Sequence, residues 1–124
     1  MKQLIVASVI ALVTTAAPAE PPKFFRDTYP EYALKSALET RGALEGKGAQ
    51  LDPKICELIG LAVSAQIPCI YCVYVHTKNA RANGATEAEI REAVATAATV
   101  RQWSTVLNGM AYDFDAFKAE VDKR

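Results

Sequence analysis

The chain has 124 residues, of which 51% are hydrophobic and 23% are charged, and its 14 basic and 14 acidic side chains give a formal net charge of zero. This length predicts one domain, and the apolar fraction is ample for a core. No basic stripe is present that would neutralise phosphates, which argues against a nucleic-acid partner.

The first 19 residues have the pattern of a secretory signal peptide. Lys2 gives a positive start, Leu4 to Val13 carries no charge, and Ala17-Pro18-Ala19 offers the small residues that precede cleavage. The apolar run is about half of the ~20 residues that a membrane-spanning helix needs, so stable membrane insertion is not expected. We therefore expect a periplasmic or secreted protein, cleaved near Ala19, in a compartment where disulfides persist.

Residues 20–52 are expected to form an N-terminal extension and a first helix. Pro21-Pro22 predicts a short extended entry, and the helix is expected from about Tyr29-Pro30 to Arg41, with proline near its start. Three glycines then interrupt the pattern: Gly42, Gly46 and Gly48.

Residues 53–124 are expected to form the main helical domain. Asp52-Pro53 is typical of a helix start, and the almost wholly apolar run of residues 53–66 predicts a buried helix. Pro68 is expected to begin the next helix, which carries two cysteines and should end at Asn83-Gly84.

Two further helices are expected toward the C-terminus. Thr86 and Glu89 form a capping box in front of an apolar stripe. A separate last helix is expected from about Trp103 to Val121, with an apolar face that serves as core or subunit interface. No segment has the alternation of a strand. The sequence therefore predicts an all-α, compact bundle of about five helices, apolar enough to oligomerise.

The most informative motif is a CxxC pair followed by the only histidine of the chain. Cys69, Cys72 and His76 occupy positions i, i+3 and i+7, which share one face of a helix. A thiol attacks only as thiolate, and the N-terminus of a helix favours an anion by ~0.3 to 1 kcal/mol. His76, at i+4 from Cys72, is placed to accept its proton. Cys72 is therefore the better candidate for the attacking sulfur, and Cys69 is placed to close a disulfide with it.

Glu57 is a carboxylate in the apolar second helix. Gly60 and Ser64 lie on the same side, so a neighbouring helix could approach closely, enclose Glu57 and let it exchange protons with His76. The alternative is a solvated ion pair with Lys54, and periodicity alone does not decide between the two.

The cysteines allow three other interpretations. Cys56 is expected to be a packed free thiol, although a tetrahedral zinc site with Cys69, Cys72 and His76 is a minor alternative. The CxxC could instead be an inert structural disulfide, but closing so short a loop removes little unfolded-state entropy. A c-type haem is excluded because its attachment needs histidine directly after the second cysteine. We expect neither a metal nor another cofactor.

Glu57, Cys69-x-x-Cys72, His76 and the segment Gly84-Ala-Thr-x-x-Glu89-Ile90 together resemble the alkyl hydroperoxidase D-like branch of the carboxymuconolactone decarboxylase family. The resemblance covers about residues 53–101. It implies an all-helical fold in homo-trimers or homo-hexamers and reduction of a hydroperoxide substrate through the cysteine pair, by a reductant that the sequence does not name.

The resemblance also implies roles for the site residues. Cys72 is the peroxidatic cysteine, Cys69 resolves it, and Glu57 and His76 form a proton relay. The best-known hydroperoxidases of the family have a histidine where this chain has Tyr71, which donates a hydrogen bond but is no base near neutral pH. We therefore expect either slower peroxide turnover or a protein disulfide as the natural oxidant. The decarboxylase members lack this CxxC, so lactone decarboxylation is not expected.

Overall fold

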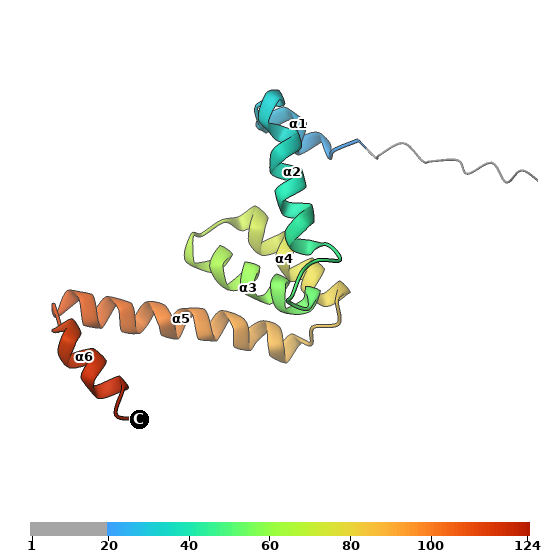
Figure 1. Cartoon of the computed structure of the whole chain (residues 1–124). Coiled ribbons are helices and arrows are strands. Elements are labelled where there is room, and N and C mark those ends of the chain that lie inside the picture. The colour runs from blue at the N-terminus through green and yellow to red at the C-terminus, as the bar shows by residue number, and fades with distance from the viewer. Residues whose placement is uncertain (1–19) are drawn as a thin grey trace, which may run out of the picture. The chain divides into compact units, whose positions relative to one another are not determined.

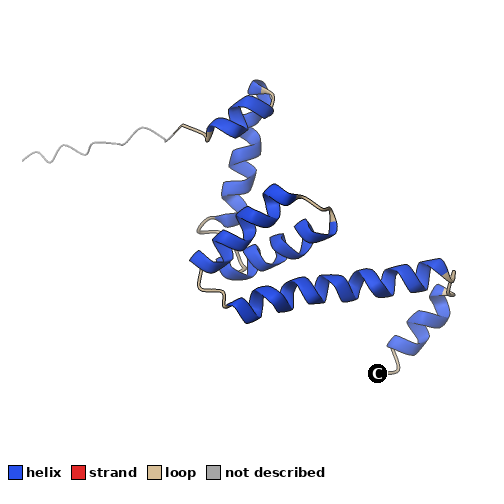
Figure 2. Ribbon diagram, turned by 180° about the vertical axis from the view of Figure 1, so that it is seen from behind, coloured by secondary structure: helices blue, strands red, loops and turns tan. Residues whose placement is uncertain are grey.

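The structure is a computed structural model that describes residues 20–124. The expected signal peptide, residues 1–19, lies outside the described residues. Every regular element in the described part is a helix (Figure 2), which confirms the all-α prediction. Residues 20–124 form six helices where about five were expected. None of these helices is both long and apolar enough to cross a membrane.

The described residues divide into two units, residues 20–39 and residues 40–124. In the first unit, α1 spans Lys23–Thr28, where an extended entry was expected. This short helix follows Pro22 and is supported by an i,i+4 ion pair between Lys23 and Asp27.

Helix α2 spans Glu31–Glu45 and therefore passes Gly42, after the expected end at Arg41. Arg41 Nε lies 2.9 Å from Glu45 Oε1, an i,i+4 ion pair that bridges this glycine.

The second unit is built on an antiparallel hairpin of α3, Pro53–Gln66, and α4, Ile70–Ala82, which lie side by side in Figure 1. The start of α3 is as predicted, since the Asp52 carboxylate accepts from the Lys54 N–H at 2.9 Å. The end of α4 is also as predicted, because Gly84 has φ +83°, a conformation that favours glycine.

Helix α5 spans Glu87–Gly109 and packs mainly against α3 (Figure 1). Its predicted capping box is present: the Glu89 N–H donates to Thr86 Oγ1 at 3.1 Å, and the Thr86 N–H donates to Glu89 Oε2 at 2.7 Å. The predicted separate helix from Trp103 is wrong. No glycine or proline interrupts the chain there, so α5 continues to Gly109.

The chain turns after α5, and α6 spans Phe114–Val121. Ala111 has φ +47°, in the left-handed region, and Asp113 accepts from the Ala116 N–H at 2.7 Å to start the new helix. The break therefore lies at residues 110–113, where this left-handed residue and an N-cap follow each other.

The core of the second unit lies where α3, α4 and α5 meet. Its buried members are Leu61, Ala80 and Ile90, one from each helix. Beyond Ala97, by contrast, no described residue is buried. Large apolar side chains such as Trp103 and Met110 remain 56% and 76% exposed.

Candidate active site

The two cysteines lie at the turn of the α3–α4 hairpin. The helix was expected to begin at Pro68, but α4 begins at Ile70, and Cys69 is its N-cap. Its N–H donates to the Ser64 carbonyl at 3.1 Å, and its Sγ accepts from the Cys72 N–H at 3.2 Å. A disulfide joins Cys69 to Cys72, with their Cα atoms 5.3 Å apart. A sulfur at the N-cap that accepts a hydrogen bond from a first-turn backbone N–H is placed where a thiolate is stabilised.

His76 and Glu57 meet across the hairpin. His76 follows Cys72 by one helical turn, and its Nδ1 lies 2.7 Å from Glu57 Oε2. The Glu57 side chain is buried, with 7% of the residue exposed. Asn79 also reaches the carboxylate, donating from Nδ2 to Glu57 Oε1 at 3.2 Å. Both oxygens of this buried carboxylate are thus partnered by side chains of α4.

The structure therefore places Glu57 in the enclosed position and not on a solvated edge. Lys54 pairs instead with Glu89, with Nζ 2.8 Å from Oε1. This ion pair joins α3 to the start of α5. The Lys54 ammonium, followed by the hydrogen bonds from Thr86, lowers the pKa of the Glu89 carboxyl to about 2, and Glu89 in turn raises the pKa of Lys54.

A glycine makes room for the imidazole. A Cβ added at Gly60 would lie 2.5 Å from His76 Cε1 and 2.6 Å from His76 Nδ1, far inside contact distance. The ring therefore rests directly on the α3 backbone, one turn after Glu57. This close approach was expected from the small residues of α3, of which Ser64 is also buried.

The contact with Glu57 also distinguishes the two ring nitrogens. An ionised carboxylate only accepts hydrogen bonds, so beside an ionised Glu57 the proton of a neutral His76 lies on Nδ1. In a neutral imidazole the other nitrogen, Nε2, is then the acceptor. The arrangement therefore leaves Nε2 of His76 as the ring nitrogen that can accept a proton.

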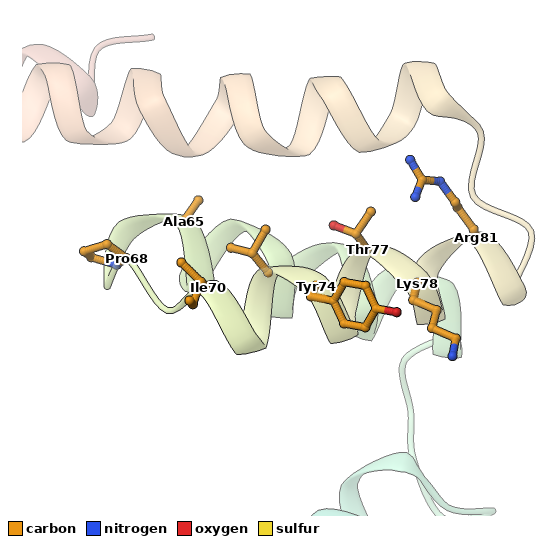
Figure 3. A pocket seen from close by; sticks show the side chains of 8 residues that line it. Ala65, Pro68, Ile70, Tyr74, Thr77, Lys78 and Arg81 are labelled. Carbon is orange, nitrogen blue, oxygen red and sulfur yellow. The ribbon is translucent and has the colours of Figure 1, made fainter.

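The structure also has a wide groove, which does not lie at these residues. It has a volume of about 810 Å³ and runs along a different face of α4, where Thr77 and Arg81 point toward α5 and Tyr74 and Lys78 do not (Figure 3). Neither of the paired cysteines lines it, nor does Glu57 or His76. A smaller cavity of about 360 Å³ is lined by Glu57, Cys56 and Asn83, together with the segment between α2 and α3. The carboxylate end of the site is therefore reached from this second cavity.

Cys56 lies apart from the other thiols. It is half-buried, and its Sγ lies 4.0 Å from the Leu51 carbonyl oxygen. Within residues 20–124, no three His, Cys, Asp or Glu side chains are grouped so as to hold a metal ion. Cys56 is thus not brought together with Cys69, Cys72 and His76, as a zinc site would need.

Asn79 is the site residue that the sequence analysis missed. It stands three residues after His76 on the same face of α4, and neighbours at this spacing on a helix meet a common partner. The pattern of Cys72, His76 and Asn79 was therefore a usable signal.

Comparison with known protein families identifies the family of the chain. A sequence profile described as the carboxymuconolactone decarboxylase family matches residues 32–113, more than half of the chain. The chain belongs to the carboxymuconolactone decarboxylase family. This family includes both alkyl hydroperoxidase D-like peroxidases and decarboxylases, and its fold combined with a CxxC disulfide fits a redox role.

One curated relative carries the name "Uncharacterized protein 4 in cox locus" and comes from Paracoccus denitrificans. It is 41% identical over 51 residues, which cover 41% of this chain and 46% of the relative. The match thus spans less than half of that protein's length. No solved structure matches the chain.

Proposed function

We propose that the protein is an exported thiol-dependent peroxidase, in which Cys69 and Cys72 cycle between dithiol and disulfide. The observation that carries the proposal is the disulfide at the start of α4, with the hydrogen-bonded His76–Glu57 pair one turn away. A base with an oriented acceptor nitrogen beside a thiol is the usual arrangement for activating a sulfur nucleophile.

The proposed first step takes place at Cys72. His76 Nε2 accepts the thiol proton, and the Cys72 thiolate attacks one oxygen of the hydroperoxide. The O–O bond breaks, Cys72 becomes a sulfenic acid, and the alkoxide takes the proton from His76 and leaves as an alcohol. Glu57 stabilises the imidazolium that forms between these transfers.

The second step closes the disulfide. Cys69, whose sulfur accepts a backbone N–H at the N-cap, attacks the sulfur of Cys72 as thiolate. The S–O bond breaks, and the departing oxygen leaves as water with the proton of the Cys69 thiol. An external dithiol then reduces the Cys69–Cys72 disulfide and is itself oxidised, which completes the cycle.

A protein disulfide oxidoreductase is the second candidate, and the residues between the cysteines favour it. Ile70 and Tyr71 are 73% and 79% exposed, so two large side chains are exposed beside the disulfide. Such side chains suit the approach of another polypeptide. The same thiols would then exchange with a protein disulfide in place of a hydroperoxide.

We also propose that the protein acts after export and as a homo-trimer or homo-hexamer. Residues 2–19 of the sequence support export. The exposed apolar side chains of the second unit support self-association, because burying them against another copy would remove them from water.

Single cysteine variants test the function. We expect Cys72→Ser to abolish turnover of cumene hydroperoxide. Cys69→Ser should stop after one equivalent with a sulfenic acid on Cys72, which dimedone traps. Cys56→Ser is the matched control and should keep wild-type turnover. Full activity of Cys72→Ser would refute the proposal. Reactivation of reduced, unfolded ribonuclease by the disulfide form, without hydroperoxide activity, would favour the oxidoreductase.

A further inference from the structure

Asn79 occupies a position that the proposed reaction does not yet use. Its Nδ2 donates to Glu57 Oε1 at 3.2 Å, while Glu57 Oε2 faces His76 Nδ1 at 2.7 Å. The bonds of Asn79 with Asn83 use only its backbone carbonyl, which accepts from the N–H and the side-chain amide of Asn83 at 2.9 Å, so the Asn79 side chain is directed at Glu57 independently of them. Glu57 thus lies between two α4 side chains, the imidazole of His76 and the amide of Asn79.

The amide acts on the carboxylate in two ways. The last torsion of a glutamate is soft and roughly two-fold, so a donor on one oxygen fixes the plane and directs the other oxygen at the imidazole. The donor also stabilises the ionised carboxylate, since hydrogen bonds to a charged acceptor are stronger than those to a neutral one. Burial makes this donor important, because Glu57 has little water to replace it.

We propose that Asn79 is a positioning residue that acts through Glu57 to hold His76 with its proton on Nδ1 and with Nε2 free to accept the Cys72 proton. The inference rests on the proposed function and deepens it. In the described part of the chain, the Asn79 side chain bonds Glu57 and neither the imidazole nor the cysteines. Its effect on the thiol passes through the carboxylate alone.

The single histidine makes the tautomer directly observable. In the reduced wild-type protein, ¹⁵N NMR of His76 should show that the neutral imidazole carries its proton mainly on Nδ1. Asn79→Leu keeps the size of the side chain and removes the donor. In this variant we expect the population of the Nε2–H tautomer to equal or exceed that of the Nδ1–H tautomer. Loss of a hydrogen bond to a charged group corresponds to about a tenfold change in the equilibrium. The alkylation rate of Cys72 at pH 7, resolved by mass spectrometry, should fall by about tenfold as well.

Three further variants complete the test. Asn79→Ala should repeat the effect, and it decides the question if the leucine variant does not fold. Asn83→Ala is the matched control at the end of the same helix, because the Asn83 side chain donates to the Asn79 backbone carbonyl, and it should leave the tautomer unchanged. In a Glu57→Gln background, Asn79→Leu should have no further effect on alkylation, because the two residues act as one unit.

The outcomes separate this inference from the proposed function. An unchanged tautomer in both Asn79 variants, an equal shift in Asn83→Ala, or additive effects of Asn79→Leu and Glu57→Gln would each overturn it. If Cys72→Ser keeps full peroxidase activity, the proposed reaction fails, whereas the tautomer measurement on Asn79→Leu still decides whether Asn79 positions His76.

Discussion

Substitution of Gly60 by alanine tests the close contact between α3 and His76. The added Cβ would lie 2.5 Å from His76 Cε1, whereas ordinary contact begins at 3.4 Å. The ring must therefore retreat by about 0.9 Å, the difference between these two distances. Gly60 and Glu57 are on the same helix, so a His76 ring that moves away from Gly60 also moves away from Glu57. Adding this displacement to the 2.7 Å bond gives about 3.6 Å, which is no longer a hydrogen bond.

The stability of Gly60→Ala should change much less than its activity. Alanine is favoured over glycine in a helix interior by about 1 kcal/mol, whereas overpacking costs ~1 to 3 kcal/mol. We therefore expect a net loss between about 0 and 2 kcal/mol in the free energy of unfolding. A displacement of about 1 Å in a catalytic group lowers turnover by roughly a hundredfold. Hydroperoxide turnover and urea unfolding measure the two effects separately.

Gly42→Ala provides the matched control. Gly42 lies inside α2, and a Cβ there would meet nothing within 4 Å. Its replacement should raise the free energy of unfolding by ~0.5 to 1 kcal/mol and leave turnover unchanged. If Gly60→Ala keeps turnover within about threefold of the wild type while folding normally, the reasoning about the imidazole contact is wrong.

Three other predictions concern the carboxylates and the cap of α5. Glu57→Gln keeps the shape of the side chain but removes its charge, and should lower turnover by about a hundredfold; a change below threefold would exclude the relay. Thr86→Ala removes the cap of α5 and should cost about 1 kcal/mol in urea unfolding, with turnover per folded molecule unaltered. The pKa of Glu89 is lowered from 4.5 to about 2, so its contribution to stability is complete above pH 4.5 and is lost as the pH falls through 2. Glu89→Gln should therefore flatten the dependence of stability on pH in this interval, and an unchanged slope would contradict the assignment.

The fold was largely predictable because its helix ends are marked locally. Asp52-Pro53, Asn83-Gly84 and the Thr86 capping box each end or begin a helix by bonds within a few residues, and all three are present. The end of α5 was not predicted. It depends on a left-handed alanine, Ala111, and propensity gives no indication of that conformation at alanine.

The candidate site was predictable where its residues share a helix. Cys69, Cys72 and His76 come from one motif, so spacing alone brings them together. The state of Glu57 depended on how closely α3 and α4 approach, which is set by Gly60 and the tertiary packing and could not be read from periodicity. Asn79 stands at helical spacing from His76, which was a usable signal, but its hydrogen bond to Glu57 depends on the same approach of α3 and α4.

Mapping of thiols after one equivalent of hydroperoxide tests the central claim most directly. Fully reduced protein has three thiols, at Cys56, Cys69 and Cys72. The account predicts that one equivalent of cumene hydroperoxide removes two of them, that mass mapping finds the new bond between Cys69 and Cys72, and that Cys56 remains free. Three unchanged thiols, or a bond that includes Cys56, would contradict it.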